Sequence, residues 1–191
     1  MRKCFLDLFS GLGGASEAFL DGWDVLRIDN NPLLLDEAPD TILCDITDLK
    51  ATTEVIREWY DSDVMPEIFV IWASPPCNQY SFANAKRDSR SFDNACVAAA
   101  RALIMNWLPD YWIIENVHGA RKTFTEILGH EPYVINQFCL WGKFPKFKVA
   151  LAHRKLDAKG SRALRPNYRA LVPYKFSREL RKTIETQQTL F

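Results

Sequence analysis

Apolar residues follow two alternating patterns along the chain: short continuous runs, and longer stretches in which every third or fourth residue is apolar. A continuous apolar run indicates a buried strand, whereas the wider spacing indicates an amphipathic helix. The runs predict strands at 4–9, 25–28, 41–44, 68–73, 111–114, 133–140 and 147–152, the last two antiparallel. The wider spacing predicts helices at 15–20, 52–60, 93–107, 123–128 and 177–187, the last of them capped by Ser177.

This alternation of strands and helices predicts an α/β fold with a mostly parallel sheet and helices on both faces. In such sheets the ligand site lies beyond the carboxyl ends of the strands. The unusual clusters of glycine, acidic, proline and cysteine residues all follow predicted strands, at 10–14, Asp29, Asp45, 74–77 and 115–116. We therefore expect one site at one edge of the sheet. Since the chain shows no internal repeat or linker, we expect a single domain over residues 1–191.

The composition, 48% hydrophobic and 25% charged over 191 residues, is typical of one globular domain and argues against a disordered or fibrous chain. Its apolar runs are far shorter than the about 20 residues of a membrane span. The N-terminus lacks the apolar core of a secretory signal, so a soluble, cytoplasmic protein is expected. Five cysteines and three histidines form no CxxC pair or Cys/His cluster, and neither a disulfide framework nor a metal site is predicted.

Charge is unevenly distributed, although the formal net charge is zero. The stretch 143–182 holds thirteen Lys and Arg residues against two acidic ones, a net charge of +11, whereas residues 1–142 carry −10. A basic C-terminal face on a neutral protein favours a polyanionic partner such as a nucleic acid. A merely solvated charged surface is the alternative.

A glycine-rich turn, residues 7–14 with the sequence DLFSGLGG, follows the first predicted strand. Glycine permits close approach of the backbone to a ligand, and a following helix start offers free N–H groups to an anionic group. The second strand ends at Asp29-Asn30, where a carboxylate can accept hydrogen bonds from ribose hydroxyls. A dinucleotide and S-adenosylmethionine both fit this pair of features, and an ordinary tight turn fits the glycines alone.

A rigid turn, Ser74-Pro75-Pro76-Cys77, ends the strand predicted at 68–73, because paired prolines cannot continue a strand ladder. It presents the Cys77 thiol at the rim of the sheet, where a thiolate can attack a substrate. A lone cysteine is more often an inert buried residue. The neighbouring prolines and the Glu115-Asn116 pair at the end of a later strand favour the reactive role.

Three of these segments, DLFSGLGGASEAF, SPPCNQYS and IIENV, resemble the first, fourth and sixth motifs of the C5-cytosine DNA methyltransferase family, in the family's order. Cys44-Asp45-Ile46 and residues 169–173 resemble two further motifs. The resemblance covers most of the chain and indicates a small, phage-like form. It implies a Rossmann-like methyltransferase fold, S-adenosylmethionine as cofactor and DNA as partner.

The resemblance also implies roles for individual residues. The Cys77 thiolate would add to C6 of cytosine, Glu115 would hydrogen-bond N3 and the amino group, and Asn116 would hold the loop that bears Cys77. Phe9 would pack on the cofactor's adenine and Asp45 would bind its amino group. The remaining cofactor candidates are Gly11, Gly13, Gly14, Asp29, Asn30, Ile46 and Pro75, and the DNA candidates after Cys77 are Gln79, Ser81, Lys86, Arg87 and Arg90. Since a stacked base cannot reach Cys77, a flipped or unpaired cytosine is expected.

The sequence departs from the family pattern at three places. Only about a dozen residues, 155–166, separate the last predicted strand from the final motif, where the family has a large target-recognition region. A short or relaxed recognition, a separate partner or a second copy of the chain would account for this. Lys146 and Lys148 stand where the family has two arginines, with Lys148 as a catalytic candidate and Lys146 as a DNA-contact candidate. Arg169-Ala170 replaces Gly-Asn, so Arg169 would contact DNA phosphate or, as a minor alternative, a methyl donor carrying an added carboxylate.

The sequence therefore predicts a DNA (cytosine-5)-methyltransferase of phage or mobile-element type. A tRNA cytosine-5 methyltransferase is the nearest enzymatic alternative. A methylase of an exocyclic nitrogen fits less well, since its site has an aromatic residue after Pro-Pro in place of Cys77. The alternative from another class is a non-catalytic module that binds the cofactor or DNA and regulates a partner.

Overall fold

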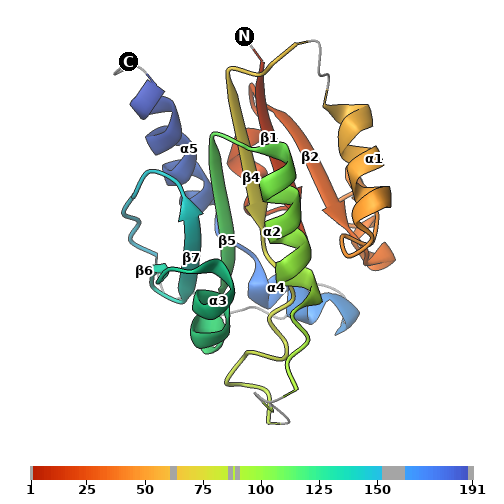
Figure 1. Ribbon diagram of the computed structural model, residues 1–191, viewed down its shortest axis with the longest axis vertical. Helices are drawn as coiled ribbons and strands as arrows, with labels where there is room; N and C mark the ends of the chain where they lie inside the picture. The colour runs from red at the N-terminus through yellow and green to blue at the C-terminus, as the bar shows by residue number, and fades with distance from the viewer. Residues whose placement is uncertain (1, 61–63, 86–87, 89–90, 152–161, 189–191) are drawn as a thin grey trace.

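The computed structural model describes residues 2–60, 64–85, 88, 91–151 and 162–188. Within these residues, one seven-stranded sheet has the order β3-β2-β1-β4-β5-β7-β6 (Figure 1). Strands β1 to β5 pair in parallel, whereas β7 pairs antiparallel with both β5 and β6. The predicted mostly parallel sheet is confirmed. The strand bounds are β1 Lys3–Leu8, β2 Asp24–Asp29, β3 Thr41–Leu43, β4 Ile68–Ala73, β5 Tyr111–Val117, β6 Tyr133–Ile135 and β7 Phe138–Lys143.

The strand order changes direction between β1 and β4. From β1 the chain adds β2 and β3 on one side, and it then returns to add β4 and β5 on the other side. The loops that follow β1 and β4 therefore diverge at the carboxyl edge of the sheet, and such a switch point is where open α/β sheets bind their ligands. The glycine turn and the loop that bears Cys77 both leave the sheet there.

Helices cover both faces of the sheet, as predicted. Helices α1 (Leu49–Trp59), α2 (Ala95–Trp107) and α3 (Arg121–Leu128) pack on one face, and α5 (Tyr174–Gln188) with the short 3₁₀ helix η1 (Glu17–Phe19) packs on the other. Successive strand residues point to opposite faces, so Leu6 and Leu8 of β1 join the first core cluster and Phe5 joins the second. Helix α4 (Arg165–Ala170) lies at the carboxyl edge (Figure 1).

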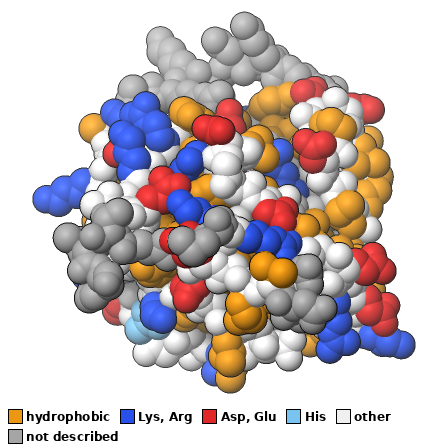
Figure 2. Space-filling model, turned by 90° about the horizontal axis from the view of Figure 1, so that it is seen from above, with side chains coloured by type: hydrophobic (Ala, Val, Ile, Leu, Met, Phe, Trp, Pro, Cys, Tyr) orange, Lys and Arg blue, Asp and Glu red, His pale blue; other side chains and the backbone are white. Residues whose placement is uncertain are grey.

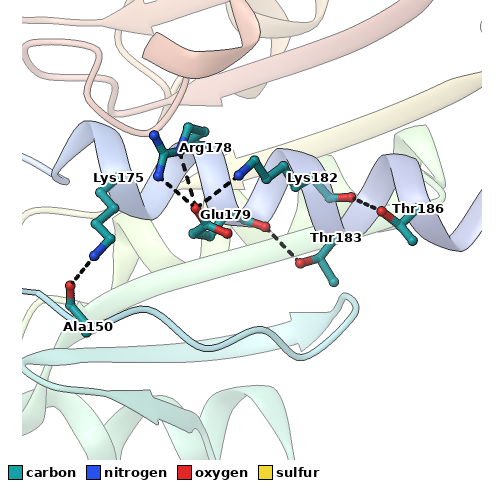
Figure 3. A network of polar contacts seen from close by, with 7 residues as sticks. All are labelled: Ala150, Lys175, Arg178, Glu179, Lys182, Thr183 and Thr186. Atoms are coloured by element: carbon teal, nitrogen blue, oxygen red, sulfur yellow. Dashed lines mark hydrogen bonds and ion pairs between the residues drawn. The ribbon is translucent and has the colours of Figure 1, made fainter.

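Helix α5 is amphipathic, with Phe176, Leu180 and Ile184 buried one turn apart against the second face. Its outer surface carries a polar network in which Arg178 and Lys182 both bind the Glu179 carboxylate (Figure 3). At the start of the helix, Lys175 Nζ donates to the Ala150 carbonyl at 2.9 Å (Figure 3). This bond joins the segment after β7 to α5.

The predicted helix at 15–20 is wrong in extent, because only three residues, Glu17–Phe19, form the helix η1. The cause lies far away in the chain. Ser177 is not a cap but a buried residue inside α5, and its hydroxyl donates to the Ala15 carbonyl and accepts from Ala18 N. Because Ser177 binds the Ala15 carbonyl, which a continuous helix would pair with Phe19 N, the segment ends as a short turn.

The predicted strand at 133–140 is two strands, β6 and β7, joined by a turn at Asn136 with φ +53°. Asparagine tolerates this left-handed conformation better than most residues. No strand forms at 147–151, and Ala152 lies outside the described residues. Lys146 and Lys148, expected on one face of a strand, are therefore on an exposed irregular segment. This segment is fixed by other bonds, including one from Tyr133 Oη to the Phe147 carbonyl at 2.8 Å.

Strand β5 runs three residues beyond its predicted end. Glu115 and Asn116 lie inside the strand, where they pair with Leu140 and Cys139 of β7. The antiparallel neighbour supplies hydrogen bonds beyond the end of the parallel part of the sheet, which extends the ladder.

None of the helices in the described part of the chain has the length and apolar character that a membrane crossing requires.

Candidate active site

The glycine turn after β1 closes against the neighbouring strand β2. Ser10 N donates to the Ile28 carbonyl at 3.1 Å, and Gly13 N donates to the Ser10 carbonyl at 2.8 Å. Phe9 has φ +55°, a left-handed conformation that non-glycine residues rarely adopt. Strained backbone of this kind gathers at binding sites, where surrounding contacts hold it in place.

Two glycines of the turn are required by contacts within the protein. A Cβ on Gly13, which has φ +72°, would lie 2.4 Å from Cζ of Arg27, and a Cβ on Gly14 would lie 2.3 Å from the Val172 carbonyl oxygen. Arg27 is buried and donates to Ser16 Oγ at 2.8 Å and to the Gly13 carbonyl at 3.1 Å. The space on the Cβ side of these two glycines is thus filled by Arg27 and by the segment before α5.

Unpartnered polar atoms lie directly beneath the turn. Both carboxylate oxygens of Asp7 and the hydroxyl of Ser10 are buried and accept or donate no hydrogen bond within the described residues. Burial raises the pKa of Asp7 to about 7, an effect that the polar groups of Ser16 and then the Arg27 guanidinium only partly offset. Buried polar groups are normally satisfied, so these atoms indicate a place where a polar ligand belongs.

Asp29, at the end of β2, is held by the turn itself. Its Oδ2 accepts from Gly11 N at 2.9 Å and its Oδ1 accepts from Asn31 N at 3.0 Å. The carboxylate is half-buried, whereas Asn30 is exposed. Asp29 therefore joins the ends of β1 and β2 and retains free lone pairs for a hydroxyl group.

Asp45 lies just after β3 at the same edge of the sheet. Its Oδ1 accepts from Thr47 N at 3.0 Å and from Thr47 Oγ1 at 2.7 Å, and these two bonds lower the pKa of the exposed carboxyl. The adjoining Ile46 is buried in the core. Burial raises the pKa of the Cys96 thiol, and so do the charges of Asp93 and Asp45, which shows that the first turn of α2 lies near Asp45.

The Pro-Pro turn after β4 is attached to both of its neighbouring strands. Ser74 N donates to the Leu8 carbonyl of β1 at 3.0 Å. Asn116 of β5 is buried and donates through Nδ2 to the Pro75 carbonyl at 2.8 Å. These bonds fix the backbone immediately before Cys77, and the Asn116 contact is of the kind that the family resemblance implies.

The Glu115 carboxyl acts on the Cys77 thiol. Burial raises the pKa of the half-buried Cys77 thiol, and the negative charge of Glu115 raises it further. Glu115 is only 9% exposed, and burial raises the pKa of its carboxyl to about 7, which the Ser74 side chain partly offsets. The two groups are thus close enough for charge on Glu115 to act on the thiol; at neutral pH the thiol is mainly protonated, whereas both forms of the Glu115 carboxyl are populated.

Hydrogen bonds between Gln79 and Asp93 join the two ends of the loop after Cys77. The Gln79 side-chain amide accepts from Asp93 N at 2.8 Å and donates to the Asp93 carbonyl. Tyr80 is buried against the rings of Phe92 and Phe124, with centroid distances of 4.8 Å and 5.1 Å. The Gln79 amide, expected to face DNA, is therefore engaged with the protein backbone and holds the two ends of the loop together.

The other predicted nucleic-acid residues lie in different surroundings. Ser81 accepts from Ala83 N through Oγ within the loop. The ammonium group of Lys146 lies over the Tyr133 ring of the edge strand β6, 5.7 Å from its centroid. Arg169 is an exposed residue of α4. Lys86, Arg87 and Arg90 lie outside the described residues.

The described basic residues of the stretch 143–182 do not gather on one face. Lys143 pairs with Trp112 at the amino end of β5, whereas α4, with Arg165 and Arg169, lies beside the glycine turn, since Asn167 Nδ2 is 3.6 Å from the position of a Cβ on Gly11. The amino edge of the sheet, viewed in Figure 2, shows acidic, basic and apolar side chains interspersed. Positively and negatively charged side chains are therefore mixed on that face.

Sequence reasoning missed several residues of this site. Arg27 belongs to an apolar strand and Asn167 to a short helix far from the motifs, so neither has a local signal. Asp7 stands inside the glycine motif, and a charged residue in an otherwise buried strand was the available signal. Across the described ranges, no three His, Cys, Asp or Glu side chains are grouped as a metal site requires.

Two larger proteins are among the solved structures that are similar to this chain. A protein described as a DNA modification methyltransferase encoded within a prophage (E. coli) has 26% sequence identity and a TM-score of 0.49, covering 67% of this chain and 36% of that one. The methyltransferase EhMeth of Entamoeba histolytica has 14% identity and a TM-score of 0.50, covering 82% of this chain and 57% of that one. The second likeness shows the shared fold. The chain thus spans about a third and just over half of these two proteins.

No curated protein sequence matches the chain. The model of the C-5 cytosine-specific DNA methylase family matches residues 4–131, a range that contains the glycine turn, the Pro-Pro-Cys turn and the Glu-Asn strand end. This range is well over half of the chain, and it shows that the chain belongs to the C-5 cytosine-specific DNA methylase family.

Proposed function

We propose that the chain transfers a methyl group from S-adenosylmethionine to C5 of cytosine in DNA, through a covalent bond between Cys77 and C6 of the base. The observation that carries this proposal is that β4 and β5 bring Cys77 and Glu115 to one edge of the sheet, where the charge of the Glu115 carboxyl raises the pKa of the Cys77 thiol. The family membership supports the same reaction.

The residues at the glycine turn fit S-adenosylmethionine. The unpartnered oxygens of Asp7 and Ser10 suit the ammonium and carboxylate groups of its amino-acid end. Asp29 would bind the ribose hydroxyls, and Asp45 would bind the adenine amino group, with Phe9 against the ring. Gly11, Gly13, Gly14, Asn30, Ile46 and Pro75 would line the same site. When bound, this cofactor supplies an electrophilic methyl group on a sulfonium.

The two residues on the DNA side divide the chemistry between them. C5 of cytosine is a poor nucleophile, and addition of the Cys77 thiolate to C6 makes it enamine-like. Glu115, with a pKa of about 7, keeps a substantial protonated fraction at neutral pH, and this form donates a hydrogen bond to N3, where negative charge develops during the addition. After C5 has taken the methyl group, a base removes the C5 proton, the C6–S bond breaks and the thiolate is regenerated. Asn116 keeps Cys77 in place throughout.

Cytosine reaches Cys77 only when it is flipped out of the duplex or unpaired. Lys148, Lys146, Arg169 and Ser81, together with Lys86, Arg87 and Arg90, are proposed to contact the phosphates around it. Sequence recognition is proposed to come from a partner, a second copy or another part of the protein. A DNA substrate places the enzyme in the compartment that holds the DNA, the cytoplasm of a bacterial or phage-infected cell.

The test is covalent trapping on duplex DNA that contains 5-fluorocytosine, in the presence of S-adenosylmethionine. Fluorine cannot leave C5 as a proton, so the protein stays bound to the DNA and the adduct is seen by denaturing electrophoresis. We expect an adduct with the natural chain and none with Cys77→Ser, while Cys96→Ser serves as the matched control and still forms it.

The alternatives are distinguished by the same assay. An adduct on 5-fluorocytosine RNA but not on DNA would show a tRNA-type enzyme, and no adduct on either would leave a non-catalytic binding module. Mass spectrometry of the modified base, after reaction on ordinary DNA, separates a transferred methyl group from a carboxymethyl group. The second product would assign Arg169 to the donor.

A further inference from the structure

A pocket opens on the face of the sheet that α2 and α3 cover, at the amino end of β5. Its volume is about 480 Å³, which is within the range of sites for small molecules. The buried side chains of Ile104 and Ile114 line it from α2 and β5, and Leu128 lines it from the end of α3. The pocket is therefore mainly apolar, and it lies toward the amino edge of the sheet, whereas Cys77 follows the carboxyl end of β4.

The Trp112 side chain, which forms one wall of the pocket, is held in place by its neighbours. The His130 ring meets it edge-on, with 6.1 Å between the ring centroids, and His130 Nε2 accepts from Gly142 N at 3.1 Å. A Cβ on Gly142 would overlap the Trp112 carbonyl oxygen and would lie 3.1 Å from Cε3 of the ring, so β7 passes directly against this residue. An aromatic wall that is already immobile loses little conformational entropy when a ligand packs on it.

Leu108, at the rim of the pocket, has a backbone conformation that costs energy. Its φ of +46° and ψ of +57° are left-handed, and glycine is the usual residue in this conformation at the end of a helix. The Leu108 side chain is 80% exposed, so packing within the described residues does not offset the strain. Met105, which lines the same rim, is also exposed. A strained residue with an exposed apolar side chain at a pocket indicates a contact with a molecule outside the chain.

Two cationic side chains, Arg101 of α2 and Lys143 of β7, line the same pocket. Both residues are exposed, and within the described ranges neither side chain has an ion-pair or hydrogen-bond partner. No carboxylate is among the described residues that line the pocket. The charge of the pocket therefore favours an anionic ligand over a neutral or cationic one.

We propose that this pocket binds a small amphipathic anion, with its apolar body against the Trp112 ring and its anionic group beside Arg101 and Lys143. An aliphatic carboxylate and an aromatic sulfonate both have this chemistry. The apolar lining and the volume fit the body of such a molecule, and the two unpaired cations fit its anionic group. The site is separate from Cys77 and Glu115, so the proposal does not depend on methyl transfer.

The probe is anilinonaphthalene sulfonate, whose fluorescence rises in apolar surroundings. We expect the natural chain to bind it and to release it when excess dodecanoate, an aliphatic carboxylate, is added. The double variant Arg101→Gln/Lys143→Gln should bind the probe about tenfold more weakly, as expected for the loss of two exposed charge contacts. Phenylnaphthylamine, which has the same rings without the sulfonate, should bind the variant and the natural chain alike. Arg57→Gln/Lys122→Gln is the matched control, because it removes the same two charges from exposed residues outside the pocket.

A second variant, Leu108→Gly, separates binding from folding. Glycine relieves the strain of φ +46°, so Tm should rise by about 1 to 4 °C, while affinity for the probe should fall about fivefold because the apolar contact of leucine is lost. Unchanged affinity in this variant would contradict the proposed contact. The proposal is also wrong if the natural chain does not bind the probe, if dodecanoate does not displace it, or if the double variant and its matched control bind it equally.

Discussion

The two halves of the carboxyl edge each contain a buried carboxyl group whose pKa is raised to about 7, Asp7 beneath the glycine turn and Glu115 beside the Pro-Pro-Cys turn. In both cases burial is the main cause. The neighbours differ, because Asp7 has the Arg27 guanidinium nearby, whereas Glu115 has the Cys77 thiol. The same physical effect therefore acts on Asp7 at the proposed cofactor site and on Glu115, the proposed proton donor beside Cys77.

The halves also differ in how they are built. The Arg27 side chain and the Val172 carbonyl occupy the positions that a Cβ on the turn's glycines would take, so the turn is closely packed against the rest of the protein. The Cys77 loop is fixed mainly by hydrogen bonds, among them those of Asn116 and Gln79. We therefore expect side-chain volume to decide the stability of the glycine turn. At the Cys77 loop we expect polarity and charge to matter more.

Gly14→Ala tests this contrast with the largest expected effect. The added methyl group would lie 2.3 Å from a backbone carbonyl that cannot rotate away, and the free energy of unfolding should fall by about 3 kcal/mol, the upper range for overpacking. Urea titration followed by circular dichroism measures it. Gly129→Ala is the control, because no atom lies within 4 Å of its Cβ position, and it carries only the strain of φ +82°. Equal losses in the two variants would show that the turn is not tightly packed.

Glu115→Gln should stabilise the protein in a pH-dependent way. A carboxyl whose pKa rises from 4.5 to about 7 on folding binds more protons in the folded state, so its stabilising contribution is present below 4.5 and declines as pH rises to about 7. Relative to the natural chain, the variant should therefore gain free energy of unfolding between pH 4.5 and 7 and remain level above that. The expected gain is about 2 kcal/mol or less after relaxation of the site.

Asp7→Asn sharpens the comparison in the same urea titrations. At pH 8 this variant should gain less free energy of unfolding than Glu115→Gln does, since Arg27 then loses its nearby countercharge. A larger gain for Asp7→Asn would indicate that Arg27 has no electrostatic part in the turn.

The smallest expected effect concerns the reactivity of Cys77. Glu115→Gln removes the negative charge that raises the pKa of the thiol, so alkylation of Cys77 by iodoacetamide at pH 8 should become about three- to tenfold faster. Peptide mass spectrometry follows the reaction residue by residue. Cys96, whose pKa is raised by burial, Asp93 and Asp45 but not by Glu115, is the internal control. An unchanged rate at Cys77 would mean that the two groups are too far apart to cooperate.

Much of the fold could be predicted because parallel strands leave a local signal. The run 68–73 and the strand β4 coincide, and the helix expected at 93–107 differs from α2 by only two residues. Predictions failed where remote contacts decide local structure: Ser177 shortens η1, and β7 extends β5 through Glu115 and Asn116. The roles expected for Cys77, Glu115 and the cofactor residues stay predictions until the trapping experiment.

By itself, the sequence determined the order of strands and helices, the family, and the placing of the glycine, Pro-Pro-Cys and Glu-Asn motifs at strand ends. These depend on neighbouring residues, on apolar spacing and on the restricted backbone of glycine and proline. Only the tertiary structure decided that Arg27 fills the space at Gly13, that Asp7 and Glu115 have raised pKa values, and that Phe82 stays exposed while Tyr80 is buried. Burial and charge proximity arise between segments far apart in the chain, and no local pattern contains them.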